Sequence, residues 1–321
     1  MVSILCITYN HEKFISDTLV GFILQQTTFP IEVLIHDDAS TDKTPEILRS
    51  YERIHPDLIT VIYQQENKWS QGIDPTIFLY KMARGKYIAW CEGDDYWTDP
   101  LKLQKQVAFL ESHPECILCH HKVTYHHEDS DEQDYQFPKI EGNQIFTKFD
   151  FYKNSSIKTC SVLFKNILSK EYYQYSHGFK AGDTPLWYYL LQFGDFGFLD
   201  ESMAVYRLHK NGIWSPLPII EKTLIGIETH ENISRKLNIS PKYLPLLYKY
   251  LRAVKIYHHL EDYQGMRKYL IKCYPHCFYA NTRQLIRICI YTPIAFFPFI
   301  DKLVHFFRKS LMFKICEKKL K

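Results

Sequence analysis

The sequence predicts an α/β fold, in which a doubly wound and mostly parallel sheet is followed by a helical C-terminal region. In the first hundred residues, short apolar runs alternate with segments whose apolar residues recur at helical spacing. From about residue 216 onward the chain is helical in pattern and rich in aromatic residues. Alternating strands and helices are typical of parallel sheets with right-handed crossovers.

Each early element has its own signal. Val2–Thr8 is apolar apart from small polar residues, as expected of a strand covered on both faces. Residues 11–26 carry Phe14, Leu19 and Phe22 at helical spacing. In the next helix, which we expect to end near residue 53, Pro45 stands close to the start. The further strands are expected at 31–36, 58–63 and 87–91, and a further helix at 75–83.

The pattern changes after residue 95. We expect a helix from about 99 to 112, a strand at 116–125, a polar surface loop at 126–142 and an α+β continuation over 145–210. Two prolines, Pro216 and Pro218, then interrupt the chain. The sequence therefore predicts two domains, residues 1–215 and residues 216–321.

The composition limits the possible classes of protein. Among 321 residues, 46% are hydrophobic and 16% aromatic, as in a globular protein. The net charge of +3 does not indicate a nucleic-acid partner. Nine cysteines at irregular spacing do not form a disulfide framework, and the chain starts directly with a strand, so we expect a reducing, cytoplasmic setting.

Cys116 and Cys119, followed by His120 and His121, resemble half of a zinc site. No second pair at suitable spacing completes it, and the apolar residues between the cysteines favour a strand.

Three carboxylates, those of Glu92, Asp94 and Asp95, directly follow a predicted buried strand. Clustered charge is costly there, and a divalent cation that also holds a phosphate relieves the repulsion. The carboxyl ends of parallel strands are also where open α/β sheets bind ligands. The alternative interpretation is a solvated turn.

Two other strands end in polar residues. The first ends in Thr8, Tyr9 and Asn10, whose backbone and side chains can meet a ligand. The second ends in Asp37 and Asp38, which can accept hydrogen bonds from a nucleobase edge or a ribose. The alternative for these aspartates is the N-terminus of a helix capped by the serine and threonine that follow.

Two later motifs add charged groups. Asp183 stands at a predicted helix start, where capping is the alternative role. Arg207, His209 and Lys210 can face a diphosphate, and a histidine is also a metal ligand. The alternative for these three residues is a solvated basic strand end.

In these motifs the chain resembles the family-2 glycosyltransferases of the GT-A fold, especially bacterial enzymes that build lipopolysaccharide or capsule. The motifs follow one another in family order over residues 1–215. They are Val2–Asn10, Glu32–Asp42, Gly85–Trp97, Gly182–Asp183 and Tyr206–Ser215.

The resemblance implies a nucleotide-sugar donor, most often a UDP-sugar, and Mn²⁺ or Mg²⁺ as the metal. It implies that donor contacts come from Thr8, Tyr9, Asn10, Asp37, Asp38, Glu92, Arg207 and Lys210. It implies that Asp94, Asp95 and His209 bind the metal, and that Asp183 is the catalytic base. Glu92 stands where the family has the first aspartate of its Asp-x-Asp motif, and Lys68 stands where the family usually has glycine after Asn67.

The expected reaction is a single displacement at the anomeric carbon, with inversion. It adds a hexosyl or N-acetylhexosaminyl group to a hydroxyl of a growing surface glycan. The alternatives are a catalytically silent nucleotide-sugar-binding scaffold and a nucleotidyltransferase, although a nucleotidyltransferase usually has a glycine-rich phosphate loop and residues 2–10 contain no glycine.

The C-terminal region has an apolar run at 288–300, interrupted by Pro293 and Pro298. It is too short for a transmembrane helix, which needs about 20 apolar residues. Lysines and arginines interleave with the aromatic residues after it, so we expect a basic amphipathic helix on the inner face of the cytoplasmic membrane, beside a lipid-linked acceptor. The alternative is a helix that packs on its own domain or on a partner chain, as in a homo-oligomer.

Overall fold

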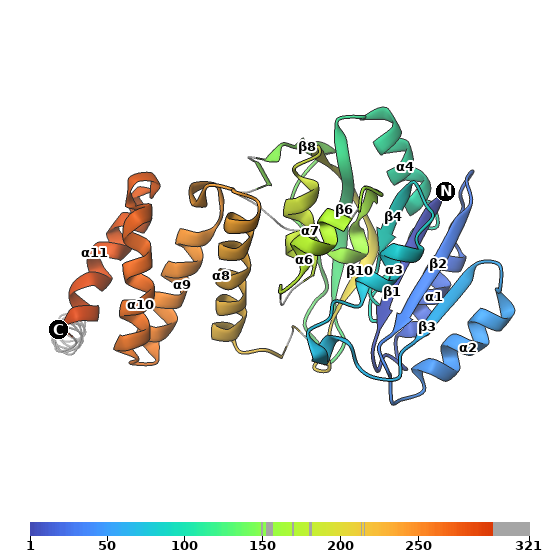
Figure 1. Ribbon diagram of the computed structural model, residues 1–321, viewed down its shortest axis with the longest axis horizontal. Coiled ribbons are helices and arrows are strands. Elements are labelled where there is room, and N and C mark those ends of the chain that lie inside the picture. The colour runs from blue at the N-terminus through green and yellow to red at the C-terminus, as the bar shows by residue number, and fades with distance from the viewer. Residues whose placement is uncertain are drawn as a thin grey trace, which may run out of the picture. The chain divides into compact units, whose positions relative to one another are not determined.

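The computed structural model describes residues 1–148, 150–151, 157–168, 170–179, 182–212, 214 and 216–297. Contacts between residues divide the chain into two compact units, Met1–Pro216 and Leu217–Lys321. The first unit contains the sheet and the second contains helices (Figure 1).

Four parallel strands form one half of the sheet in the first unit, in the order β3-β2-β1-β4. They are β1 (Val2–Thr8), β2 (Ile31–Asp37), β3 (Ile59–Tyr63) and β4 (Tyr87–Trp90). Continuous apolar runs of this kind are typical of strands that are covered on both faces. The α/β fold is therefore confirmed.

The other half of the sheet is mixed. β9 (Leu163–Lys165) runs antiparallel between β4 and the long strand β6 (Cys116–His127), and β6 pairs in parallel with β10 (Asp195–Leu208). Three short strands pair antiparallel with these two long ones: β5 (Tyr96–Trp97) and β8 (Gln144–Phe146) with β10, and β7 (Tyr135–Phe137) with β6. This antiparallel part was not evident from the strand pattern of the first hundred residues.

Helices cover both faces of the sheet (Figure 1). They are α1 (Ile15–Ile23), α2 (Thr44–Ile54), α3 (Thr76–Met82), α4 (Lys102–Ser112), α6 (Lys170–Ser176) and α7 (Asp183–Leu190). Alternate residues of a strand point to opposite faces. On one face Ile4 and Cys6 share a core with apolar residues of α1, α2 and α4. On the other face, the ring of Trp90 lies 6.5 Å from that of Tyr80 in α3 and 6.3 Å from that of Trp187 in α7.

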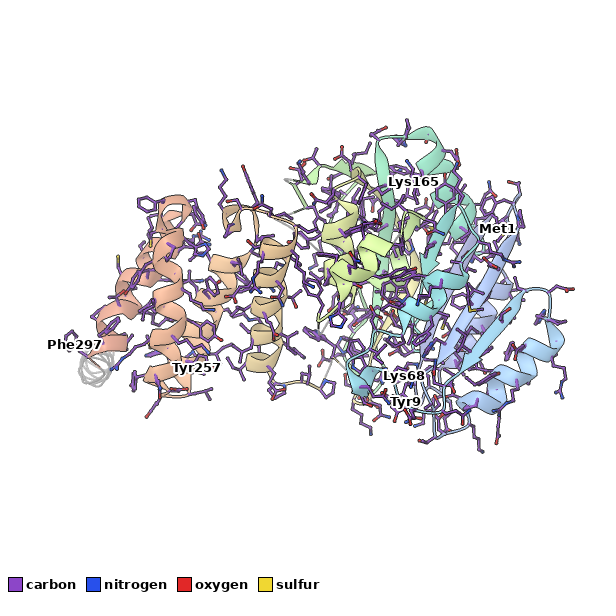
Figure 2. The ribbon with its side chains drawn as sticks, viewed as in Figure 1. Met1, Tyr9, Lys68, Lys165, Tyr257 and Phe297 are labelled. Carbon is purple, nitrogen blue, oxygen red and sulfur yellow. The ribbon has the colours of Figure 1, made fainter. Side chains whose placement is uncertain are left out.

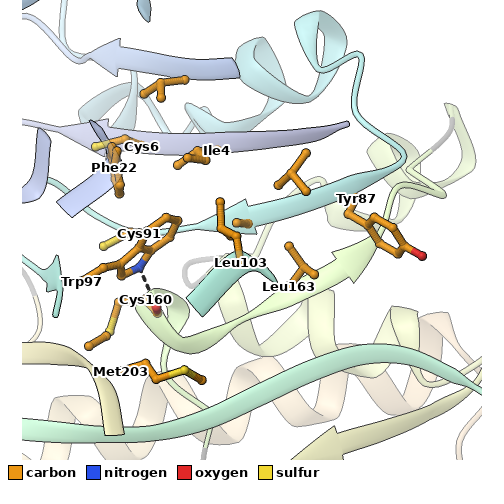
Figure 3. Packing of buried hydrophobic residues seen from close by; sticks show 14 of the residues in the cluster. Ile4, Cys6, Phe22, Tyr87, Cys91, Trp97, Leu103, Cys160, Leu163 and Met203 are labelled. Atoms are coloured by element: carbon orange, nitrogen blue, oxygen red, sulfur yellow. Dashed lines mark hydrogen bonds between the residues drawn. The ribbon is translucent and has the colours of Figure 1, made fainter. Parts of the chain in front are cut away.

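Figure 3 shows part of the first face, where Phe22, Leu103 and Met203 lie near Trp97 and Leu163 lies farther along the same cluster. The indole nitrogen of Trp97 donates a hydrogen bond of 2.9 Å to the carbonyl of Cys160. A buried indole N–H needs such a partner, so this bond ties β5 to the chain just before β9.

Two sequence expectations differ from the structure. The first helix begins at Ile15 rather than at residue 11, after a turn in which the carbonyl of His11 accepts the amides of Phe14 and Ile15. The expected surface loop at 126–142 contains the end of β6 and the strand β7, which the aromatic residues Tyr135 and Phe137 anchor on Tyr125.

The second unit contains helices α8 (Ile219–Lys236), α9 (Leu246–His259), α10 (Tyr263–Cys273) and α11 (Thr282–Phe296). Within the residues that the structure describes, we find no helix long and apolar enough to cross a membrane. The basic part of the expected amphipathic helix, from Lys302 onward, lies outside the described residues.

A lysine is buried in the core of the first unit. Lys102 is fully buried, and its Nζ donates to Oε1 of Gln106 at 2.7 Å and lies 4.0 Å from the ring centre of Trp97. Burial lowers the pKa of Lys102 to about 8, although three neighbouring cysteines oppose this effect. The unfolded chain keeps its lysine protons up to a pKa of about 10.4.

This pKa difference predicts how stability depends on pH. Between about pH 8 and pH 10 the unfolded chain binds more protons than the folded one, so Lys102 makes the protein more stable as the pH rises. We expect Lys102→Met to remove this contribution. Urea unfolding between pH 7.5 and 9.5 should show the wild type gaining up to about 1.4 kcal/mol per pH unit relative to the variant. The exposed Lys43→Met serves as the control, and parallel pH profiles for wild type and Lys102→Met would contradict the prediction.

Candidate functional site

The candidate site lies where the parallel strands end. The register of the sheet places Thr8 of β1 beside Asp37 of β2, and Asp37 beside Tyr63 of β3. The chain that follows β4 carries the acidic cluster, and the amide of Gly93 donates to the carbonyl of Ile7 at 2.9 Å. The strand ends that the sequence singled out therefore meet at one edge of the sheet.

The end of β1 is fastened to the turn after β2. Asn10 adopts the left-handed φ of 57° that asparagine tolerates. Its side-chain carbonyl accepts a hydrogen bond of 2.8 Å from the amide of Thr41, and its own amide donates to Ser40 Oγ at 2.9 Å. Tyr9 is 38% exposed at this edge. The hydrogen bonds of Asn10 therefore shape the turn, whereas the exposed side chain of Tyr9 is open to a ligand.

The two aspartates after β2 differ in their partners. Asp37 is buried, and its Oδ1 has no hydrogen-bond partner among the described residues. Burial raises the pKa of Asp37, although hydrogen bonds from Ser40 oppose this. A buried polar atom without a partner is uncommon, so Asp37 is a candidate for accepting a hydrogen bond from a ligand.

Asp38 is instead occupied by the protein. Its two carboxylate oxygens accept hydrogen bonds from the amides of Lys68 (2.8 Å) and Trp69 (3.0 Å), and the Nε2 of His36 lies 3.3 Å from Oδ1. Asp38 thus holds the loop after β3 against the site, and its expected contact with the nucleoside stays a prediction. Figure 2 shows Lys68 and Tyr9 at this end of the unit.

The acidic turn packs tightly against β1. A side chain on Gly93 would place its Cβ 2.7 Å from Thr8 Oγ1 and 3.0 Å from His11 Nδ1. Glycine is therefore required at this position for the turn to approach the strand. From α1, the hydroxyl of Thr18 lies 2.6 Å from the carbonyl oxygen of Asp95 and donates to it.

Burial favours the neutral form of Glu92. Thr159 donates a hydrogen bond to its carboxyl group. Burial raises the pKa of Glu92 to about 8, and the charges of Asp94 and Asp183 add to this effect, against the opposing hydrogen bond of Thr159. At neutral pH the group is mostly protonated, so it can donate a hydrogen bond to a ligand.

Asp94 faces two histidines. Its Oδ2 lies 3.1 Å from Nε2 of His209 and 3.7 Å from Nε2 of His11. Burial raises the pKa of Asp94, but the two histidines outweigh burial and bring its pKa below the usual value. Asp94 therefore stays ionised next to two groups that are common metal ligands.

Asp95 has a different environment from Asp94. It is 2% exposed, and its Oδ1 accepts a hydrogen bond of 2.9 Å from the backbone amide of Arg207. Burial, followed by the charges of Asp94 and Glu92, raises the pKa of Asp95 well above its usual value. Asp95 therefore connects the acidic turn to β10, and its expected metal role stays a prediction.

Arg207 is also engaged within the protein. One guanidinium nitrogen donates to the carbonyl of Asp94 at 2.9 Å, another pairs with Asp17, and the group lies 4.4 Å from the ring centre of Tyr96. Arg207 therefore holds the acidic turn in place, and its expected contact with a diphosphate stays a prediction. Lys210 is exposed, so its ammonium group stays available for that role.

Asp183 is the first residue of α7 and is partly exposed. Its Oδ1 accepts a hydrogen bond of 2.6 Å from the amide of the next residue, Thr184, but it is not the helix cap, because the N-cap residue is Gly182. Its charge also contributes to the raised pKa of Glu92, so it lies near the acidic turn. A Cβ on Gly182 would lie 3.2 Å from Oδ2 of Asp74, so the loop after β3 also reaches the start of α7.

Sequence reasoning missed two of these residues. His11 was assigned only to a helix, yet its Nδ1 lies 3.2 Å from Thr8 Oγ1 while its Nε2 faces Asp94. Asp74 stands before Pro75 and Thr76, a context typical of a helix start, and the sequence gives no signal that it reaches the site. Its Oδ1 does accept hydrogen bonds from Thr76, but its Oδ2 side faces Gly182.

The donor set fits a metal that is shared with a substrate. In the described part of the chain, no three histidine, cysteine, aspartate or glutamate side chains are grouped so that they could hold a metal by themselves. Asp94 and His209 are within 3.1 Å, and Nδ1 of His209 is buried without a partner. Mg²⁺ is commonly bound by one or two protein groups together with substrate phosphates. Asp94 and His209 suit that arrangement.

Several known proteins are similar to the chain in sequence. It is 40% identical over 218 residues to an uncharacterised protein of Mycobacterium tuberculosis. This match covers 66% of this chain and 60% of the relative. It is 31% identical over 216 residues to TuaG of Bacillus subtilis, which is named for a glycosyltransferase role in teichuronic acid biosynthesis, and this match covers 67% of the chain and 82% of the relative.

Solved structures of low sequence identity share the fold. TarS residues 1–349 of S. aureus, in complex with UDP-GlcNAc, align with a TM-score of 0.56 at 18% identity, over 84% of this chain and 90% of that one. The mannosyltransferase PcManGT of Pyrobaculum calidifontis, in complex with GDP-Man and Mn²⁺, aligns with a TM-score of 0.52 at 15% identity, over 92% of this chain and 80% of that one.

The family described as Glycosyl transferase family 2 matches residues 3–171, which hold β1 to β4, the acidic turn and the loop fastened by Asp38. More than half of the chain is thus matched, and the chain belongs to glycosyltransferase family 2.

Proposed function

We propose that the protein transfers a sugar from a UDP-sugar to a hydroxyl group of a growing surface glycan, with a divalent metal and with inversion at the anomeric carbon. The observation that carries the proposal is the pair formed by Asp94 and His209, 3.1 Å apart in the same site as Asp183 in a chain of this family. The name of TuaG supports a surface glycan as the product.

The nucleoside end of the donor belongs beside Asp37 and Tyr9. The unpartnered Oδ1 of Asp37 can accept a hydrogen bond from the base or the ribose, and the loop fastened by Asp38 lies next to it. The UDP-GlcNAc held by the TarS structure supports a UDP-sugar as the donor, and the sugar would be a hexosyl or N-acetylhexosaminyl group.

The diphosphate end belongs beside Asp94 and His209, which would hold Mn²⁺ or Mg²⁺. When bound, the metal offsets the charge that develops on the leaving diphosphate. Mn²⁺ in the PcManGT complex supports this choice of ion. The exposed Lys210 lies one residue after His209 and would add a positive charge near the diphosphate.

Asp183 would act as the base. As the acceptor oxygen bonds to the anomeric carbon, the bond from that carbon to the leaving phosphate oxygen breaks, and the hydroxyl proton moves to the carboxylate of Asp183. Its partial exposure leaves the carboxylate open to an incoming acceptor. One displacement needs one base, which is why inversion is part of the proposal.

Asp183→Asn tests the base. General-base catalysis contributes about 100-fold to 10,000-fold, so we expect transfer from UDP-glucose or UDP-GlcNAc to lipid-linked acceptors to fall by that factor. UDP affinity, measured by calorimetry, should stay within about twofold because Asp183 does not hold the nucleotide. The control is Asp57→Asn, which replaces an exposed aspartate far from Asp183 in the sequence. Equal turnover in Asp183→Asn would overturn the mechanism, and a wild type that binds UDP but transfers nothing would support a silent scaffold.

Asp94→Asn tests the metal. Loss of an ionised ligand should weaken Mn²⁺ binding in the presence of UDP by about tenfold or more, as measured from the electron paramagnetic resonance signal of free Mn²⁺. His209→Ala should have an effect in the same direction. Unchanged Mn²⁺ affinity in both variants would remove these residues from the metal site, and Asp57→Asn again serves as the control.

We also propose that the protein works on the inner face of the cytoplasmic membrane, where a lipid-linked acceptor would lie. Support comes from one side of α11, where Ile286 and Ile290 are both 53% exposed and Arg283 and Arg287 are exposed beside them. Residues at this spacing share one helix face. Apolar and basic side chains on one face suit the headgroup region of anionic bilayers.

Co-sedimentation with lipid vesicles tests this placement. We expect the full chain to bind vesicles that contain phosphatidylglycerol more strongly than pure phosphatidylcholine vesicles, because basic residues favour anionic lipid. Replacing Ile286 and Ile290 together by serine should lower the bound fraction several-fold, whereas Ile54→Ser, an exposed change in the first unit, should leave it unchanged. If the double variant instead dissociates an oligomer and vesicle binding is absent, a second copy covers this face.

A further inference from the structure

Three tyrosines form a row across neighbouring strands. The sheet register pairs Tyr135 of β7 with Tyr125 of β6, and Tyr125 with Tyr206 of β10. The ring of Tyr125 is stacked on that of Tyr135 at 4.9 Å and lies 5.1 Å from that of Tyr206. Tyr135 is 43% exposed at one end of the row. Burial, followed by the charges of Asp95 and Glu92, raises the pKa of Tyr206, so the other end of the row lies by the acidic turn.

Lys158 lies over this row. Its Nζ is 4.6 Å from the ring centre of Tyr206 and 5.5 Å from that of Tyr125. The next residue, Thr159, donates its hydroxyl proton to Glu92, so the backbone at Lys158 is held at the acidic turn. The row of tyrosines and Lys158 therefore adjoin the candidate transfer site.

The ammonium group of Lys158 is partly buried but has no acidic partner at close range. Among the described residues, no carboxylate oxygen lies within 4.0 Å of its Nζ. Burial lowers the pKa of Lys158, but Tyr125 and then Asp183 outweigh burial and raise it, so the group stays charged. Partly buried charges in proteins are usually paired, so this one is suited to a negative group that a ligand brings.

The position of Lys158 indicates the acceptor rather than the donor. The charge of Asp183, the candidate base, raises the pKa of Lys158, so Lys158 lies near that carboxylate. The base must lie beside the hydroxyl that it deprotonates. A cation near the base therefore lies near the acceptor. Aromatic side chains with a few placed polar groups are also the usual lining of sites for small ligands.

We propose that Lys158 and the tyrosines 125, 135 and 206 form an acceptor subsite for a sugar that carries a negative charge, either a carboxylate or a phosphate. This inference rests on the proposed function and adds the chemical class of the acceptor. The anionic group pairs with the ammonium of Lys158, and the sugar ring packs on the exposed Tyr135 at the end of the row.

Three glycosides that differ at one carbon test the proposal: p-nitrophenyl β-D-glucoside, its 6-phosphate and p-nitrophenyl β-D-glucuronide. Their dissociation constants are measured by nuclear magnetic resonance titration of the full chain, saturated with UDP and Mn²⁺ so that the donor site is filled. We expect at least one charged glycoside to bind about tenfold more tightly than the neutral one. The tighter of the two charged glycosides identifies whether the group is a carboxylate or a phosphate.

Variants then assign the preference to Lys158. Lys158→Met should remove the preference and Lys158→Arg should keep it, while the exposed Lys139→Met, just after β7, should not change it. Equal binding of the three glycosides by the wild type, or no binding of either charged one, overturns the proposal without any variant. A preference that survives in Lys158→Met also overturns it.

The affinity for UDP separates this inference from the proposed function. If the wild type does not bind UDP in the presence of Mn²⁺, the proposed function fails first. If Lys158→Met loses UDP affinity by more than about twofold, Lys158 belongs to the diphosphate instead and the acceptor subsite is wrong. Unchanged UDP affinity together with a lost preference for the charged glycosides supports the subsite.

Discussion

The candidate site depends on how the short turn from Glu92 to Asp95 is held. Gly93 donates to β1, the hydroxyl of Thr18 in α1 donates to the carbonyl of Asp95, and the carboxyl group of Asp95 accepts the amide of Arg207 in β10. The last contact joins the parallel half of the sheet to the mixed half. Because His209 lies two residues beyond Arg207 on the same segment, the same bond brings His209 to Asp94. This bond, together with that from the Arg207 guanidinium to the carbonyl of Asp94, holds the pair that we assign to the metal.

Burial divides the three adjacent acids into different roles. Asp94 has two histidines near its carboxylate and remains ionised, whereas Glu92 and Asp95 lose their charge more readily because burial dominates their surroundings. A cation is attracted to the ionised acid, and a neutral acid can donate a hydrogen bond. Three carboxylates within four residues therefore need not all bind metal.

The charges at the site are arranged on two sides. Asp94 and His209 suit a cation and the diphosphate it would carry, while Lys158, whose pKa the charge of Asp183 raises, suits an anionic group on the acceptor. The same principle operates on both sides, because a buried or partly buried charge is stable only with a partner of opposite sign. The charged side chains without a protein partner therefore indicate that the substrates carry groups of opposite charge at those positions.

The sequence by itself determined the α/β fold, the elements of the parallel half and the family, because apolar periodicity and short motifs are local properties of the chain. It also identified most of the residues that meet at the sheet edge. It did not distinguish the role of Asp37 from that of Asp38, or the role of Asp94 from that of Asp95. It also did not identify His11 or Lys158 as residues of the site. Each of those distinctions depends on partners far along the chain, such as the amide of Lys68 for Asp38 or that of Arg207 for Asp95. Only the tertiary structure decides them, because the hydrogen bonds and burial that set the charge of a side chain come from residues that folding brings to it.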